Sequence, residues 1–383
     1  MSRPTEARWQ VRASRCIDYV LDTVDDVFDP RSDSLLAAGR HEGSRRFVVV
    51  DAQVYRFHAP RIENYFRQRA IEARILPMMA GEAGKTVEAW LGIVRELDQF
   101  PIHRRDEPII AIGGGVLTDV VGFVASSYRR GVPHVKVPTT LMGYVDASVG
   151  IKTGINFNGH KNRLGSFEPA RAVLLDRRLL ATLPLRHQRN GLCEIIKLAL
   201  ACDAELFEML EHDGARGLAS AFQDEGAQPI LDRAIDGMLK ELSPNFYEDE
   251  LARKVDFGHT FSYGLEMYFE ERLLHGEAVL LDILFSCVLA HERGLLEGAL
   301  IERVFALVRR LGIEPAYDLL DAELMWGSLL DRVEHRNGQQ LVPLPCALGQ
   351  CVFVNDITRA EVAASIRILQ TWTTQADERI TEC

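Results

Sequence analysis

The stretch VDFGHTFSYGLEMYFEERLLHGE, residues 255–277, places His259 and His275 sixteen residues apart on segments expected to be helical. Two neutral imidazoles form only part of a metal site, because catalytic zinc usually has three protein ligands and an open fourth position. The best candidate for the third ligand is Glu194 in NGLCEIIKLAL, where an unpaired charge on an apolar helix would be costly to bury. The alternative is that both histidines are ordinary and that Glu194 pairs with Lys197, one turn later.

Length and composition limit the class of protein. At 383 residues the chain exceeds the size at which one core stops growing, so two domains are expected. The formal net charge of −11 argues against a nucleic-acid or anionic-membrane partner, because such proteins usually present a basic face. The seven cysteines form neither a CxxC pair nor an even disulfide framework, and no export signal or membrane span is visible. We therefore expect a cytoplasmic protein that acts on a small molecule.

The N-terminal half alternates strand-like and helix-like segments. FVVVD, residues 47–51, is typical of a buried strand and ends in Asp51, at the edge where open α/β sheets bind ligands. The next strand is followed by a turn that carries Glu82 and Lys85, and then by an amphipathic helix. This order predicts a parallel sheet.

A turn of three glycines, residues 113–115 in PIIAIGGGVLTDVVGF, links the next strand to a helix expected to begin near Val116. Glycines allow the backbone to approach a pyrophosphate, and the helix N-terminus offers free N–H groups to it. The pattern is half a dinucleotide fingerprint, because Thr118 stands where the last glycine would be. A tight turn with a purely structural role is the alternative.

The segment after this helix, residues 134–176, is dense in small and polar residues between two short strands, which favours a long binding loop between them. From about residue 186 the chain is mainly helical. We therefore predict an α/β plus all-α protein, with a Rossmann-like α/β domain over residues 1–185 and a helical domain over residues 186–383.

Together these motifs resemble the dehydroquinate synthase superfamily, the sugar phosphate cyclases. The resemblance spans roughly residues 45–360 and implies an NAD-binding α/β domain, a helical metal-binding domain, an active site in the cleft between them and a homodimer. It also implies that Glu194, His259 and His275 bind zinc, or cobalt. The motifs that carry it are GGGVLTDVVGF, VPTTLMGYVDASVGIKTGIN, GHKNRLGSF, NGLCEIIK, FGHTF and LLHGEAV.

The resemblance assigns further roles by matching positions. It implies that Arg130 crosses the dimer interface to the partner's substrate phosphate, although a solvated charge at a helix end is the alternative. The NAD-contacting positions are Asp51, Glu82, Lys85, Gly114, Gly115, Asp119, Thr139, Thr140, Asp146 and Lys161. The catalytic and substrate-binding positions are Asp146, Lys152, Asn162, Lys197, Lys240 and Asp256.

Departures from dehydroquinate synthases concern the substrate. These enzymes typically carry an arginine four residues before an asparagine, where this chain has Ala252 and Asp256. Without a bidentate arginine, and with an added negative charge, a substrate that has a hydroxymethyl ketone fits better than one with a carboxylate. Sedoheptulose 7-phosphate is such a substrate. Three further substrate-binding candidates, Leu242, His335 and Tyr263, also differ from that pattern, and the first two are similar to the 2-epi-5-epi-valiolone synthase branch.

The activity implied is a redox-neutral cyclisation of sedoheptulose 7-phosphate by transient NAD-dependent oxidation, phosphate elimination, re-reduction and aldol closure. The stereochemistry of the product stays open, so 2-epi-valiolone and desmethyl-4-deoxygadusol synthases are alternatives, followed by 3-dehydroquinate synthase. A metal-dependent alcohol or glycerol dehydrogenase and a catalytically inactive regulator are rivals from other classes.

Overall fold

The computed structural model describes residues 8–14, 16–37, 39, 45–79 and 81–381. Its N-terminal half is built on a six-stranded sheet in the order β1-β8-β5-β4-β2-β3, in which all paired neighbours are parallel. The strands are β1 (Val20–Thr23), β2 (Arg46–Asp51), β3 (Ala73–Met78), β4 (Ile109–Gly113), β5 (His134–Pro138) and β8 (Ala172–Leu175).

Helices cover both faces of this sheet, which is why its central strands read as continuous apolar runs. Along β2 the side chains alternate: Val48 and Val50 pack in the core beside α2, whereas Phe47 and Val49 pack beside α3 and α4. The helices are α1 (Ser34–Ala37), α2 (Ala52–Gln68), α3 (Val87–Gln99) and α4 (Gly115–Ser127). Short 3₁₀ turns lie at Glu82–Gly84 (η1) and Tyr128–Arg130 (η2).

The two short strands expected within residues 134–176 are present as β5 and β8, but the expectation of a long loop between them is wrong. After β5 the chain forms a π-helical turn, η3 (Gly143–Ala147), and an antiparallel hairpin of β6 (Lys152–Phe157) and β7 (His160–Phe167) before it enters β8. The hairpin packs on α4 so closely that a Cβ at Gly122 would lie 2.4 Å from the Thr153 side chain. The small residues of this segment therefore serve close packing.

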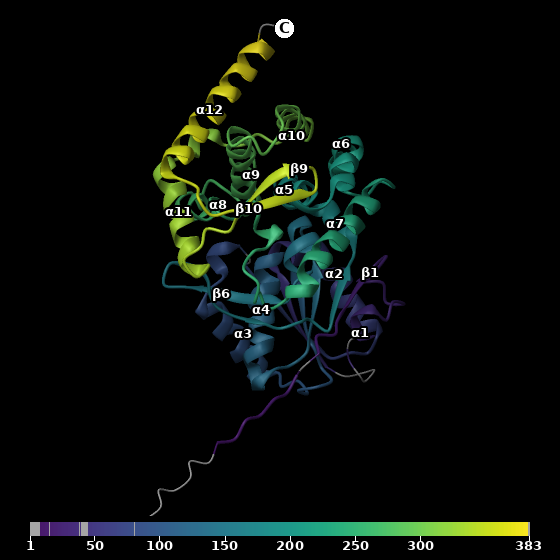
Figure 1. Ribbon diagram of the computed structural model, residues 1–383. Helices are drawn as coiled ribbons and strands as arrows, with labels where there is room; N and C mark the ends of the chain where they lie inside the picture. The colour runs from purple at the N-terminus through teal and green to yellow at the C-terminus, as the bar shows by residue number, and fades with distance from the viewer. Residues whose placement is uncertain (1–7, 15, 38, 40–44, 80, 382–383) are drawn as a thin grey trace, which may run out of the picture.

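The C-terminal half is a helical bundle around α9 (His275–Glu292), of which residues 278–290 are all buried. In Figure 1 this bundle and the β9–β10 hairpin lie above the parallel sheet, and α12 projects from the top. The other elements are η4 (Arg177–Thr182), α5 (Leu185–Cys202), α6 (Ala204–Ala219), α7 (Ala227–Leu242), η5 (Ser243–Asn245), η6 (Lys254–Asp256), α8 (Ser262–Tyr268), α10 (Gly298–Arg310), η7 (Tyr317–Leu319), α11 (Ala322–His335), β9 (Val342–Ala347), β10 (Gln350–Val354) and α12 (Arg359–Thr381).

The predicted class, a parallel α/β half followed by a helical half, is confirmed. The sheet ends at Leu175 and α5 begins at Leu185. The domain boundary between residues 185 and 186 stays a prediction. Among the described residues, no helix is both long and apolar enough to cross a membrane.

Candidate active site

The glycine turn lies between β4 and α4, at the carboxyl edge of the sheet. Gly114 is the N-cap of α4, and a Cβ there would lie 2.9 Å from the Thr140 side chain. Asp51 ends the neighbouring strand β2, and its Oδ1 accepts hydrogen bonds from the Gln53 and Val54 N–H groups at the start of α2. Free N–H groups of α4 and a carboxylate on the adjacent strand thus share one edge, which suits a dinucleotide.

Close backbone approaches at three glycines connect this turn to the helical half. A Cβ at Gly115 would lie 2.8 Å from Ala147 of η3, and one at Gly191 of α5 would lie 2.5 Å from the backbone nitrogen of Met142. A Cβ at Gly276 of α9 would lie 2.0 Å from the carbonyl oxygen of residue 190. A chain of contacts therefore runs from the glycine turn through η3 and α5 to the N-terminus of α9. Each glycine makes one of these contacts possible, because a larger residue would place a side chain between the two elements.

Three side chains meet where these elements converge. Glu194 lies on α5, and His275 lies at the start of α9. The potential ligand atoms of these two residues and of His259 all lie within 4.8 Å of one another. The Oε1 atom of Glu194 is 3.6 Å from Nε2 of His259 and 3.4 Å from Nε2 of His275. This Oε1 is buried and has no hydrogen-bond partner among the residues that the structure describes. A carboxylate and two imidazoles that converge on one point form a donor set suited to zinc.

Each imidazole is oriented through its other ring nitrogen. Nδ1 of His259 lies 3.1 Å from the carbonyl oxygen of Phe257, and Nδ1 of His275 lies 3.2 Å from Oε2 of Glu266. Donation by both Nδ1–H groups would direct the two Nε2 lone pairs to the point that they share with Glu194, which is the usual arrangement of metal-binding histidines. The other oxygen of Glu266 accepts a hydrogen bond of 2.6 Å from Lys161 of β7.

The charges around the cluster favour a cation. Burial, reinforced by Lys197, lowers the pKa of His259 to about 3, so this imidazole is neutral. Burial would also lower the pKa of His275, but the Glu266 and Glu194 carboxylates outweigh it and raise that pKa to about 10. The Glu266 and Glu194 carboxylates thus favour a positive charge at the point between His275 and Glu194, where a metal ion would bind.

The alternative interpretation of Glu194 was an ion pair with Lys197 in place of a metal site. Nζ of Lys197 lies 2.5 Å from Oε2 of Glu194, so the helical ion pair exists together with the histidine cluster, one on each carboxylate oxygen. Burial would lower the pKa of Lys197, but Glu194 and Asp146 raise it. Burial and the Glu194 charge raise the pKa of Asp146, which lies on η3. A buried ammonium thus stands beside the candidate metal site.

The backbone around His259 is held by α9. Asp282 of α9 is buried, and its Oδ2 accepts hydrogen bonds from the N–H groups of Phe261 at 2.6 Å and Ser262 at 3.0 Å. Gly258 has φ +75°, and a Cβ there would lie 2.9 Å from Ile283. Glycine and Asp282 therefore allow the GHTFS turn to pack on α9 and place His259 beside the helix that carries His275.

The remaining residues expected to contact NAD lie around the glycine turn. Nζ of Lys85 is 2.7 Å from Oδ2 of Asp119 on α4, and Oε1 of Glu82 accepts a hydrogen bond of 2.8 Å from the amide of Asn156 on β6. Thr139 is buried, and within the described part of the chain its hydroxyl has no hydrogen-bond partner. The Lys85 and Glu82 contacts hold η1, α4 and the hairpin together. The Thr139 hydroxyl, just after β5, is left for a ligand to bond.

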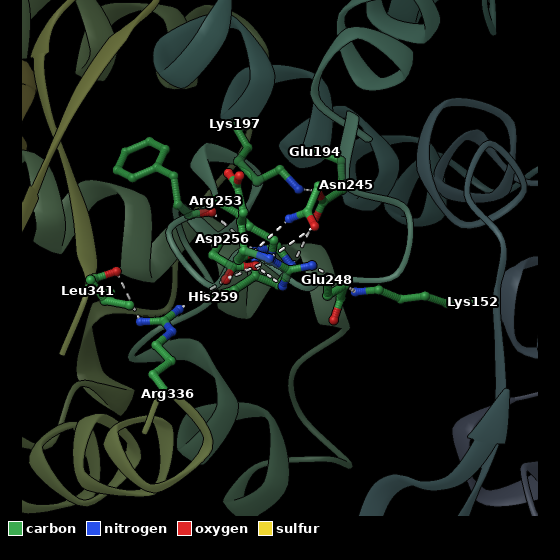
Figure 2. A network of polar contacts seen from close by, with 12 residues as sticks. Lys152, Glu194, Lys197, Asn245, Glu248, Arg253, Asp256, His259, Arg336 and Leu341 are labelled. Carbon is green, nitrogen blue, oxygen red and sulfur yellow. Dashed lines mark hydrogen bonds and ion pairs between the residues drawn. The ribbon is translucent and has the colours of Figure 1, made fainter. Parts of the chain in front are cut away.

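A row of alternating charges crosses from the α/β half to the helical half (Figure 2). Lys152 of β6 pairs with Glu248, which also pairs with Arg253. Arg253 pairs with Asp256 at 2.5 Å, and Asp256 pairs with Arg336, the residue after α11, at 3.1 Å. Only Lys152 and Asp256 of these five residues were found from the sequence. The i,i+3 spacing of Arg253 and Asp256 was the signal that could have revealed Arg253.

The added negative charge expected at Asp256 is present, but two arginines compensate it. Burial would raise the pKa of Asp256, but Arg253 and Arg336 outweigh it and lower that pKa. The carboxylate is thus ionised and neutralised by two guanidinium groups. Repulsion of a second carboxylate by Asp256 cannot be the reason for substrate choice.

Several other candidates make no contact with this cluster among the contacts of the described residues. Arg130 is exposed at the far end of α4 from the glycine turn, and a helix of 13 residues is about 20 Å long. Lys240, Asn162 and His335 are exposed, whereas Arg336, next to His335, is buried and bonded to Asp256. Two others pack against protein. Leu242 is half-buried against the core, and Tyr263 lies under the guanidinium of Arg332 at 5.3 Å.

Fold and site together define an enzyme that places a dinucleotide turn beside a Glu–His–His metal cluster. Profiles of the 3-dehydroquinate synthase N-terminal and C-terminal regions match residues 75–190 and 191–333. The chain belongs to the dehydroquinate synthase family, the sugar phosphate cyclases.

Relatives within the family are more specific. The chain is 50% identical over 365 residues to a 2-epi-5-epi-valiolone synthase from an Actinoplanes species, with 93% of this chain and 92% of that one covered. The solved structure of ValA, a 2-epi-5-epi-valiolone synthase from Streptomyces hygroscopicus subsp. jinggangensis 5008 with NAD⁺ and Zn²⁺ bound, matches with a TM-score of 0.91 and 43% identity, over 95% of this chain and 99% of that one. A demethyl-4-deoxygadusol synthase from Trichormus variabilis is 36% identical over 94% of this chain and 90% of that one.

Proposed function

We propose that this protein is a sedoheptulose 7-phosphate cyclase that forms 2-epi-5-epi-valiolone and releases phosphate. The observation that carries the proposal is the buried cluster of Glu194, His259 and His275 beside the glycine turn, in a chain half identical to an enzyme of that name. The proposed reaction is redox-neutral: C5 is oxidised, phosphate is eliminated, C5 is reduced again, and an intramolecular aldol reaction closes the ring.

The proposal gives each part of the site a task. When bound, NAD takes up and returns a hydride, and zinc, or cobalt, acts as a Lewis acid. The N-terminus of α4 would hold the pyrophosphate, and Glu194, His259 and His275 would hold the metal. Lys197 would stabilise negative charge that develops on a substrate oxygen, because a buried ammonium interacts strongly with charge in a site from which water is excluded.

Binding of the sugar phosphate falls to cationic groups at the rim of the site. Lys152 is more than half exposed and can turn from Glu248 to a phosphate group. Arg130 lies beyond the end of α4 that is remote from the glycine turn, which supports a homodimer in which it reaches the partner's site. A cytoplasmic location is a proposal from the cysteine pattern, and the substrate contacts of Asn162, Lys240 and His335 are proposals from the family resemblance alone.

The test is a comparison of two substrates with the zinc- and NAD-loaded enzyme. We expect phosphate release from sedoheptulose 7-phosphate without net NADH accumulation, and a kcat/KM at least about a hundredfold lower for 3-deoxy-D-arabino-heptulosonate 7-phosphate, which corresponds to about 2.8 kcal/mol. Comparable values would indicate a dehydroquinate synthase, and steady NADH production would indicate a dehydrogenase. NMR of the product distinguishes 2-epi-5-epi-valiolone from 2-epi-valiolone and desmethyl-4-deoxygadusol.

A further inference from the structure

Arg253 is an arginine at the site that neither the metal cluster nor the glycine turn uses. It directly follows Ala252, the position at which a dehydroquinate synthase typically carries its arginine. Its guanidinium is mostly buried, with 17% of the side chain exposed. A buried guanidinium beside a sugar phosphate site would be a ready receptor for a carboxylate, because its fork of donors matches two carboxylate oxygens.

The guanidinium of Arg253 is already occupied by carboxylates of the same chain. Nη2 lies 2.5 Å from Oδ1 of Asp256 and Nε lies 3.3 Å from Oδ2, so Asp256 is held on both oxygens. Nη1 donates to Oε1 of Glu248. Each of the three guanidinium nitrogens of Arg253 therefore contacts an acidic side chain, and Asp256 takes the geometry that a substrate carboxylate would need.

Asp256 is held in this position from its other side. Nη2 of Arg336 lies 3.1 Å from Oδ2 of Asp256, and Nη1 of Arg336 lies 2.7 Å from the carbonyl oxygen of Gln340. Figure 2 shows Arg336 and Lys152 approaching the Arg253 group from opposite sides. For Asp256 to release Arg253 it would also have to change its contact with an anchored, buried arginine, which is costly.

We infer that Asp256 and Glu248 determine substrate specificity by sequestering Arg253, so that a sugar phosphate with a carboxylate finds no free guanidinium. The inference rests on the proposed function, which supplies the contrast between a hydroxymethyl ketone and a carboxylate. It differs from charge repulsion, because Asp256 is neutralised by two arginines. In this site an arginine is present, but it cannot receive a ligand.

Binding measurements with two ligands test this inference. Isothermal titration calorimetry is performed on the zinc-loaded protein with NADH bound, so that the ligand cannot be oxidised. The proteins compared are the wild type, Glu248→Gln, the double variant Glu248→Gln/Asp256→Asn, and the double variant combined with Arg253→Ala. The ligands are sedoheptulose 7-phosphate and 3-deoxy-D-arabino-heptulosonate 7-phosphate. Both carry a phosphate, and only the second carries a carboxylate.

We expect the double variant to bind the heptulosonate at least tenfold more tightly than the wild type does, with no gain in affinity for sedoheptulose 7-phosphate. Adding Arg253→Ala should abolish that gain. Equal gains for both ligands would overturn the inference, because they would mean that Glu248 only competes with phosphate for Lys152. A gain that persists without Arg253 would also overturn it.

The experiment distinguishes a failure of the inference from misfolding of a variant and from a failure of the proposed function. If the double variant does not fold, Glu248→Gln alone carries the test, with a smaller gain selective for the heptulosonate expected and an absent or unselective gain contradicting the inference. Turnover of sedoheptulose 7-phosphate by the wild type tests the proposed function independently. A selective gain in an enzyme that does not turn over this sugar would refute the function and retain the role of Arg253.

Discussion

Replacement of Glu266 should weaken metal binding although Glu266 does not face the metal position. Its Oε2 accepts the Nδ1–H of His275, and its Oε1 accepts Lys161 from the other half of the chain. The carboxylate therefore fixes the tautomer and the ring orientation of His275 and increases its basicity at Nε2. Loss of such a partner typically reduces metal affinity 10–100-fold, or about 1.4–2.8 kcal/mol at about 1.4 kcal/mol per tenfold.

Two substitutions should give graded effects. Glu266→Gln keeps an oxygen that can accept the Nδ1–H but removes the charge. A hydrogen bond to a charged group is worth about 1–1.5 kcal/mol more than a neutral one, so we expect roughly a 5–10-fold loss of affinity. Glu266→Ala removes the acceptor and should reach the upper part of the 10–100-fold range.

The assay is zinc competition against a chromogenic chelator, which reports affinity without reference to activity. Glu270→Gln is the matched control, because Glu270 is an exposed carboxylate four residues further along the chain. Its zinc affinity should equal that of the wild type. If both Glu266 variants also bind zinc within twofold of the wild type, Glu266 does not orient His275 and the reasoning about this cluster fails.

Three further changes test other parts of the argument. His275→Ala should lose metal and activity together, and a full zinc content by elemental analysis would contradict its role as a ligand. Mixing Arg130→Ala with Lys197→Ala subunits should restore some activity, since each hybrid dimer would contain one intact site; no recovery despite demonstrated subunit exchange would argue against action across the interface. Gly276→Ala should lower the free energy of unfolding in urea by about 1–3 kcal/mol or more, because its Cβ would lie 2.0 Å from a carbonyl oxygen of α5. Gly237→Ala on α7, where nothing lies within 4 Å of the added Cβ, should be neutral or stabilising by contrast, and equal losses for the two would refute the packing argument.

The order of elements and the composition of the metal cluster could be predicted from the sequence. An apolar run such as residues 47–51 predicts a strand buried on both faces, because period and burial are local properties of the chain. Glu194 stood out because an ionised group on an apolar helix needs a partner. His259 and His275 were assigned to the same metal site as Glu194 because their motifs occur in the order typical of the family. Such motifs give residue types at given positions, but they do not give the distances between the side chains.

Only the tertiary structure revealed which groups neutralise one another. From the sequence, Asp256 was interpreted as an added charge and Ala252 as a missing arginine. In the fold, Arg253, Glu248 and Arg336 come from separate turns and the end of a distant helix to surround Asp256. The sequence by itself determined the fold class and the residues able to bind a metal, because hydrophobic period and ligand type are written locally. The net charge that a substrate meets depends on long-range contacts between side chains, so only the folded chain decided it.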